Sequence, residues 1–218
     1  MSDNDHAPPE ALRIRSELQD LSDRVYAAVE SGVEVARHFF SLKEDRRVDP
    51  WLFSHLVRFG ALEYLPDAEA IEEEVEDVSL KRNPMCGIEL THGRKTIRIW
   101  KKPNNEELFL QPPGDSPARQ RFYVQPQRRL EGTEYLFVDR ANFVYVWDLN
   151  GSGVDLYLVK PKGFEAKWAA ADCEWWIAVE HPATRVAPVT AFDELEDERL
   201  DIELDDTGFG DDDPETGA

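Results

Sequence analysis

The chain has 218 residues, of which 41% are hydrophobic, and its 45 acidic and 25 basic residues give a net charge of −20. This length allows one large domain or two small ones, and the eleven Phe, six Tyr and six Trp exclude a chain that is disordered throughout. The charge argues against nucleic-acid binding by the molecule as a whole. It fits a very soluble protein, a binder of basic partners or a protein adapted to high salt.

The cysteine content and the N-terminus indicate a cytoplasmic protein. Two cysteines, Cys86 and Cys173, are too few for a disulfide scaffold and are interpreted as thiols in a reducing compartment. No apolar run approaches the roughly 18 residues of a membrane span. The acidic start, Met1–Asp5, does not resemble a signal peptide. We therefore expect no contact with a membrane.

A long helix is predicted over about residues 10–42, after a flexible arm at residues 1–9. Apolar residues recur at alternating steps of four and three, which places them on one stripe of the helix. The members of the stripe are Ile14, Leu18, Leu21, Val25, Ala28, Gly32, Val35 and Phe39. In one interpretation the stripe packs on the rest of the protein. In the other it mediates a homodimer, because the spacing also fits a heptad.

A second helix is predicted to begin at Asp49-Pro50, where Asp49 supplies the N-cap and Pro50 suits the first turn. Either Gly60 or the Leu65-Pro66 pair ends it. The two helices form a predicted hairpin over residues 10–66. Residues 67–79 are interpreted as an acidic linker or helix, because seven residues between Asp67 and Asp77 are acidic and none is basic.

Strand patterns dominate residues 80–190. One hairpin is predicted around the His92-Gly93 turn, and a second joins Phe143–Leu149 to Val154–Lys160 through Asn150–Gly153. The remaining predicted elements are a short strand at Leu108–Leu110, a short helix from Ser116-Pro117 to Val124 and a last strand at Trp175–Val179. No alternation of strands and helices is present. The sequence therefore predicts an α+β fold, with an N-terminal helical hairpin followed by a mainly antiparallel β-sheet or small barrel.

A locally basic segment offers a candidate nucleic-acid surface. Residues 80–140 hold twelve Lys or Arg and seven Asp or Glu, with aromatic residues between the cations. Cations interleaved with aromatic rings suit phosphate backbones and exposed bases. The candidate residues are Arg98, Trp100, Lys101, Lys102, Arg119, Arg121 and Tyr123. Ordinary surface charge, or a dock for the protein's own acidic tail, is the alternative.

The C-terminal segment, residues 191–218, is predicted to be a disordered acidic tail. It carries 13 acidic residues and one basic residue, Arg199. Such a segment cannot bury enough apolar surface to fold alone, but its apolar residues can order on a partner. The candidate partner-binding residues are Phe192, Leu195, Leu200, Ile202 and Leu204.

Motifs for phosphate loops, dinucleotide binding and zinc proteases are absent, as is a CxxC pair, so we expect no cofactor and no metal. One enzyme class remains as an alternative. The order of a helical hairpin before an antiparallel sheet, with Lys101, Arg119, Arg121 and Tyr123 on the later part, resembles that of small toxin-type ribonucleases. The resemblance implies metal-independent phosphodiester cleavage by electrostatic stabilisation and proton transfer.

Together these features favour binding over catalysis. The sequence predicts a non-enzymatic binding or regulatory protein that holds a protein partner with its helices or acidic tail. The β-rich domain adds a predicted surface for nucleic acid. The alternatives are the metal-independent ribonuclease and a structural or assembly protein that associates through its first helix.

Overall fold

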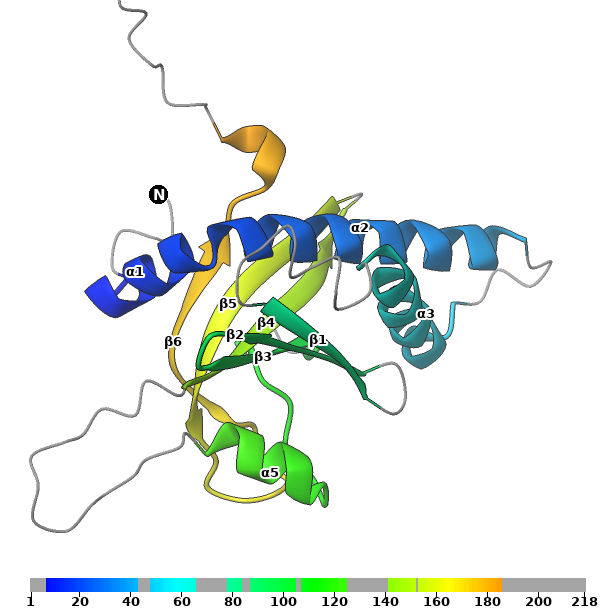
Figure 1. Ribbon diagram of the computed structural model, residues 1–218. Coiled ribbons are helices and arrows are strands. Elements are labelled where there is room, and N and C mark those ends of the chain that lie inside the picture. The colour runs from blue at the N-terminus through cyan, green and yellow to red at the C-terminus, as the bar shows by residue number, and fades with distance from the viewer. Residues whose placement is uncertain are drawn as a thin grey trace, which may run out of the picture. The chain divides into compact units, whose positions relative to one another are not determined.

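The computed structural model describes residues 7–42, 48–65, 78–83, 87–104, 107–124, 141–151 and 153–185 (Figure 1). The predicted tail and its residues Phe192, Leu195, Leu200, Ile202 and Leu204 lie outside the described residues, as does the acidic run from Asp67 to Asp77. The elements in chain order are α1 (Pro9–Glu17), α2 (Gln19–Ser41), α3 (Pro50–Tyr64), β1 (Val78–Asn83), β2 (Gly87–His92), β3 (Lys95–Lys101), α5 (Pro117–Tyr123), β4 (Ala141–Asn150), β5 (Gly153–Gly163), β6 (Asp172–Val179) and the 3₁₀ turn η2 (Pro182–Thr184).

The six strands form one sheet in the order β1-β2-β3-β4-β5-β6. All neighbours are antiparallel except β3 and β4, which run parallel with Lys95 opposite Ala141. The predicted α+β fold with a mainly antiparallel sheet is confirmed. Of the two predicted forms, sheet or barrel, the described strands adopt the open sheet, with β1 and β6 at its edges.

The parallel β3–β4 pair was not predicted from the sequence. The chain leaves β3, passes through α5 and returns to begin β4 beside the start of β3. A parallel pair needs such a crossover, because a tight turn can only join antiparallel strands. A single crossover leaves no repeating βαβ pattern in the sequence, so the prediction missed it.

The predicted first helix is divided at Leu18. Its backbone angles, φ −99° and ψ 15°, leave the helical region and separate α1 from α2. Hydrogen bonds still bridge the bend, because the Leu18 N–H donates to the Ile14 carbonyl and the Ser22 N–H donates to the Leu18 carbonyl. The apolar stripe therefore continues through the bend. Ile14, Leu18, Leu21, Val25 and Ala28 are all buried.

The sequence predicted the N-caps of two helices correctly, but it misassigned two short strands. The Asp49 carboxylate accepts hydrogen bonds from the N–H groups of Trp51 and Leu52 at 2.8 and 3.2 Å, and the Ser116 hydroxyl accepts from the Arg119 N–H at 3.3 Å. The strand predicted at Leu108–Leu110 is wrong, since Leu108 is irregular and Phe109 and Leu110 form a bend. In contrast, β1 occupies residues that had been assigned in part to the acidic linker.

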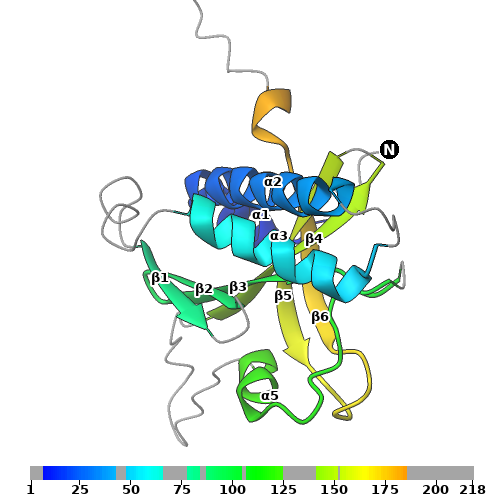
Figure 2. The same ribbon diagram turned by 90° about the vertical axis from the view of Figure 1, so that its right-hand side faces the viewer.

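The helices α1, α2 and α3 lie on one face of the sheet and α5 lies on the other (Figures 1 and 2). The larger core joins the apolar stripe of α1 and α2 to inward residues of the strands, including Phe143, Tyr145 and Trp147. Two buried hydrogen bonds tie α2 to the sheet. The hydroxyls of Ser22 and Tyr145 lie 2.7 Å apart, and the Tyr26 hydroxyl donates to the Val154 carbonyl.

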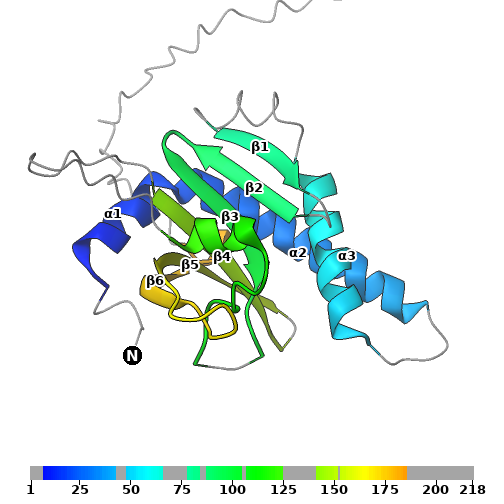
Figure 3. The same ribbon diagram turned by 90° about the horizontal axis from the view of Figure 1, so that it is seen from below.

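Helices α2 and α3 cross at two glycines. A Cβ added to Gly32 would lie 2.1 Å from the Val57 carbonyl oxygen, and one added to Gly60 would lie 2.8 Å from the Gly32 Cα. Only glycine permits backbones to approach so closely. Beyond this crossing, α3 and the C-terminal end of α2 extend past the strands (Figures 1 and 3).

Candidate binding surfaces

Four of the seven predicted nucleic-acid residues, Arg98, Trp100, Arg119 and Tyr123, lie in one cluster where β3 meets α5. Lys101 alternates with Trp100 and so belongs to the opposite face of β3, and Lys102 lies beyond the end of the strand. The Trp100 ring lies 5.5 Å from Phe122 and 5.4 Å from Tyr123, centroid to centroid. The guanidinium of Arg119 lies 5.8 Å from the Trp100 ring, and that of Arg98 lies 4.3 Å from the Phe122 ring. Cations over aromatic faces attract the ring quadrupole, so these contacts stabilise the packing of α5 on the sheet.

Most polar groups of this cluster already have partners within the protein. Arg98 forms an ion pair with Glu89 at 2.7 Å. Arg119 donates to the Pro112 carbonyl at 3.2 Å, and Arg121 donates to the Pro117 carbonyl at 3.3 Å. These contacts reduce the number of donors that can reach an incoming phosphate.

Tyr123 and Lys102 also have internal roles. Tyr123 is buried, its hydroxyl donates to the Gln111 carbonyl at 2.7 Å, and burial raises its pKa well above the ordinary value. The Lys102 ammonium lies 5.0 Å from the Phe109 ring and 5.8 Å from the Tyr157 ring. A buried tyrosine can neither stack on a base nor exchange a proton with a substrate unless the surface rearranges.

A second surface consists of exposed apolar side chains on α2 and α3. Val35 and Phe39 are the last members of the predicted stripe, and they emerge from the core with 40% and 37% of their surface exposed. On α3, Trp51 and Phe59 are 63% and 49% exposed. Because a Cβ on Gly60 would lie 3.1 Å from the Val35 Cβ, Val35 lies beside the α3 segment that includes Phe59. We call these four residues the hairpin patch.

Trp51, His55 and Phe59 lie along one side of α3. These residues are four apart, so they form one row on the helix surface. The His55 ring packs 4.1 Å from the Trp51 ring, centroid to centroid. Burial and the neighbouring Arg58 guanidinium lower the pKa of His55 below its ordinary value, which keeps the imidazole neutral. The row therefore presents two aromatic rings and a neutral imidazole.

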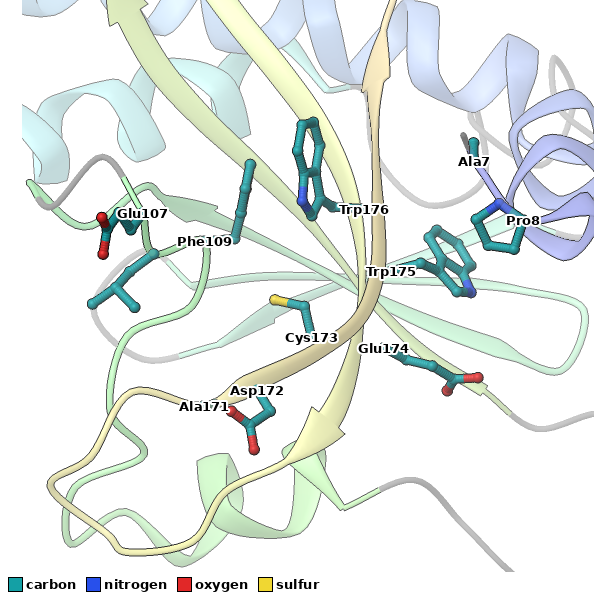
Figure 4. Close-up of a pocket in the computed structure, with 11 residues that line it drawn as sticks. Ala7, Pro8, Glu107, Phe109, Ala171, Asp172, Cys173, Glu174, Trp175 and Trp176 are labelled. Atoms are coloured by element: carbon teal, nitrogen blue, oxygen red, sulfur yellow. The ribbon is translucent and has the colours of Figure 1, made fainter. Parts of the chain in front are cut away.

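A third surface is a cavity of about 530 Å³ beside the edge strand β6 (Figure 4). Phe109 and Trp176 lie on one side of the strand, and Pro8 and Trp175 lie on the other (Figure 4). Its apolar walls are formed in part by stacking of the Phe109 ring on Trp176, with centroids 4.4 Å apart. The volume lies within the range of roughly 300–1,000 Å³ that is typical of ligand sites. We call this cavity the β6 groove.

Carboxylates surround the β6 groove. Glu107, Asp172 and Glu174 line it, and none of its lining residues is basic. The Lys160 ammonium pairs with Glu174 at 3.1 Å and with Glu10 at 2.8 Å, so its charge is shared by two carboxylates. The rim is acidic as a result.

Cys173 lines the same groove with a partly buried thiol. Burial and the Asp172 carboxylate raise the pKa of its thiol to about 12, so it stays protonated at neutral pH. In the described part of the chain, His, Cys, Asp and Glu side chains do not gather in groups of three or more that could hold a metal ion. No described helix combines the length and the apolar character that crossing a bilayer requires.

Sequence reasoning identified the β3–α5 cluster and the strand that became β6, but it missed the β6 groove. The groove draws on residues 7–8, 107–109 and 171–176, which are far apart in the chain. No pattern in any one of these segments signals that the others lie nearby. Comparison with family models, with curated proteins and with solved structures finds no match for this chain.

Proposed function

We propose that this protein is a non-enzymatic binding protein that holds a protein partner on the hairpin patch. The observation that carries the proposal is the exposure of Val35, Phe39, Trp51 and Phe59 where the two helices extend past the sheet. Exposed apolar patches of this kind mark interaction sites, and Trp is enriched among the residues that dominate binding energy.

The partner is a different protein that offers the apolar face of a helix. Two crossed helices with aromatic residues beside them suit the helix-in-groove mode of recognition. A second copy of this chain is a weaker candidate, because each copy carries a net charge of −20 and the copies repel one another. A homodimer through the first helix is also disfavoured, since the apolar stripe is buried within the protein as far as Gly32, which packs on α3.

The test compares partner capture by the full chain with capture by Trp51→Glu and Phe59→Glu variants. Leu12→Glu on α1 is the matched control, because Leu12 is also exposed, at 42%, and lies outside the hairpin patch. We expect a protein that binds the wild type and the control but is lost from both hairpin variants. The purified partner should then bind the variants at least about tenfold more weakly.

Two results would contradict this proposal. If every captured protein binds all four chains equally, the hairpin patch has no role in binding. If the wild-type chain dimerises in sedimentation experiments and Trp51→Glu abolishes the dimer, the occupant is a second copy.

Nucleic-acid binding at the β3–α5 cluster remains an alternative proposal. It is supported by the half-exposed Lys101 and Lys102 and the exposed Arg121, and weakened by the internal contacts of Arg98, Arg119 and Tyr123. Oligonucleotide binding across a salt series tests it, because each phosphate contact adds about 0.7–0.9 to the slope of log affinity against log salt. Lack of binding at low salt excludes it.

A further inference from the structure

The edge strand β6 has a free side. It pairs with β5 through Leu156–Val179 to Lys160–Trp175, and no other described strand pairs with it. Backbone N–H and C=O groups on the free side of an edge strand are open to another extended chain. Its regularly paired part, Trp175–Val179, has five residues, which is within the usual length of a strand.

The two edges of the sheet are protected differently. At the opposite edge, β1 carries Lys81 and Arg82, both exposed, which is a common way to discourage pairing with other chains. β6 contains no Lys, Arg or Pro. The register shifts between Lys160 and Gly163 distort only its first part, and the residues from Trp175 to Val179 pair in regular register. Its second half, Trp175–Val179, therefore lacks the cations, prolines and register shifts that discourage pairing at an edge.

The β6 groove lies along the first half of this edge. Phe109 and Trp176 form an aromatic wall on one face of the strand, and Pro8 lies with the largely buried Trp175 on the other (Figure 4). Side chains of an added strand alternate between the two faces of a sheet. An extended segment that pairs with β6 would therefore place every other side chain against the wall of Phe109 and Trp176.

The negative charge of the groove's rim determines which kind of segment can bind beside β6. Asp172 and Glu174 are exposed, the Lys160 ammonium is shared by Glu174 and Glu10, and the Lys102 ammonium lies over the Phe109 ring. The remaining negative charge repels the chain's own tail, which has 13 acidic residues and one basic residue. It attracts Lys and Arg, and Arg also stacks favourably on Trp and Phe.

We propose that the free edge of β6 binds an extended basic segment of another protein as an added strand. Backbone pairing supplies affinity, and the acidic rim with its aromatic wall selects Arg and Lys side chains. The site is separate from the hairpin patch, so either proposal can fail while the other stands.

The test uses the full chain and a fluorescent peptide of alternating Arg and Val with the length of β6. Two further peptides carry methyl groups on backbone nitrogens. In one peptide every Arg is methylated at its backbone nitrogen, and in the other every Val is. In an added strand only alternate N–H groups face the neighbour. We expect the parent peptide to bind and one methylated peptide to bind at least about tenfold more weakly than the other. Both have the same charge, so attraction to the acidic tail cannot produce this difference.

Protein variants provide a second readout. Asp172→Lys reverses one rim charge, and Glu165→Lys makes the same change at an exposed position outside the groove. We expect Asp172→Lys to weaken binding about tenfold and Glu165→Lys to change it much less, at physiological salt where screening extends over about 8 Å. Hydrogen exchange of residues 172–179 should slow in the complex.

The proposal is overturned if the parent peptide does not bind, if the two methylated peptides bind alike, or if both Lys variants weaken binding equally. Trp51→Glu, which alters the hairpin patch, should leave peptide binding unchanged. If the Trp51→Glu variant no longer captures a partner, that result bears only on the hairpin patch.

Discussion

Glu10 ties the start of α1 to the edge of the sheet through two side chains. Its carboxylate accepts hydrogen bonds from the Lys160 ammonium at 2.8 Å and from the Trp175 indole N–H at 3.3 Å. Burial alone would raise the pKa of Glu10, but the hydrogen bond and charge of Lys160 outweigh burial and lower it. The folded pKa lies below the unfolded value of about 4.5, so the ionised carboxylate stabilises the fold above that value.

We expect Glu10→Gln to lower the free energy of unfolding by about 0.5–1 kcal/mol at pH 7, because the pair is partly exposed. The difference from wild type should shrink as the pH falls from about 4.5 through the lower folded pKa, since Glu10 then loses its charge in both states. Urea unfolding at several pH values measures this, with Glu165→Gln as the control. A difference that is independent of pH would show that the charge is not responsible.

At the scale of elements, the crossing of α2 and α3 depends on glycine at a buried contact. Alanine is the better helix former by about 1 kcal/mol, so Gly32→Ala would stabilise α2 if it stood alone. In the folded protein the added Cβ would lie 2.1 Å from the Val57 carbonyl oxygen, which forces the helices apart.

We therefore expect Gly32→Ala to destabilise the protein by about 1–3 kcal/mol, as overpacking does in other cores. Gly153→Ala is the matched control. Its added Cβ would lie 3.7 Å from the Asn150 carbonyl oxygen, and we expect a change within about 0.5 kcal/mol. Chemical denaturation of both variants measures the difference. A stabilised Gly32→Ala variant would mean that the helices are not in close contact.

At the scale of the whole described chain, the helices and the sheet share one core. Buried residues of α1, α2 and α3 belong to the same apolar cluster as Phe143, Tyr145 and Trp147 of β4. Neither layer can keep its apolar face buried without the other. The predicted hairpin and β-rich segments are thus joined by packing, and a cut between them would expose both faces.

We expect residues 7–185 to unfold in a single cooperative transition. Helix content at 222 nm and the fluorescence of the buried Trp147 and Trp175 should change at the same denaturant concentration. Two separate midpoints would show that the helices and the sheet unfold independently.

Local signals in the sequence predicted most elements but not their neighbours. Asp49 and Ser116 were identified as helix caps because capping depends on residues within one turn. The parallel β3–β4 pair, the position of β6 at an edge and the burial of Tyr123 depend on contacts between distant segments. Four of the candidate nucleic-acid residues meet between β3 and α5, where their aromatic and cationic side chains largely contact one another.

By itself, the sequence determined the helical stripe, the capping residues, the hairpin turns and the uneven charge, because periodicity, turn chemistry and composition act locally. The tertiary structure decided which parts of these patterns remain exposed. It buried the stripe as far as Gly32, left Val35 and Phe39 at the surface, and gathered residues 7–8, 107–109 and 171–176 around the free edge of β6. The exposure of a residue depends on which distant segments pack over it, and a local sequence pattern cannot predict this packing.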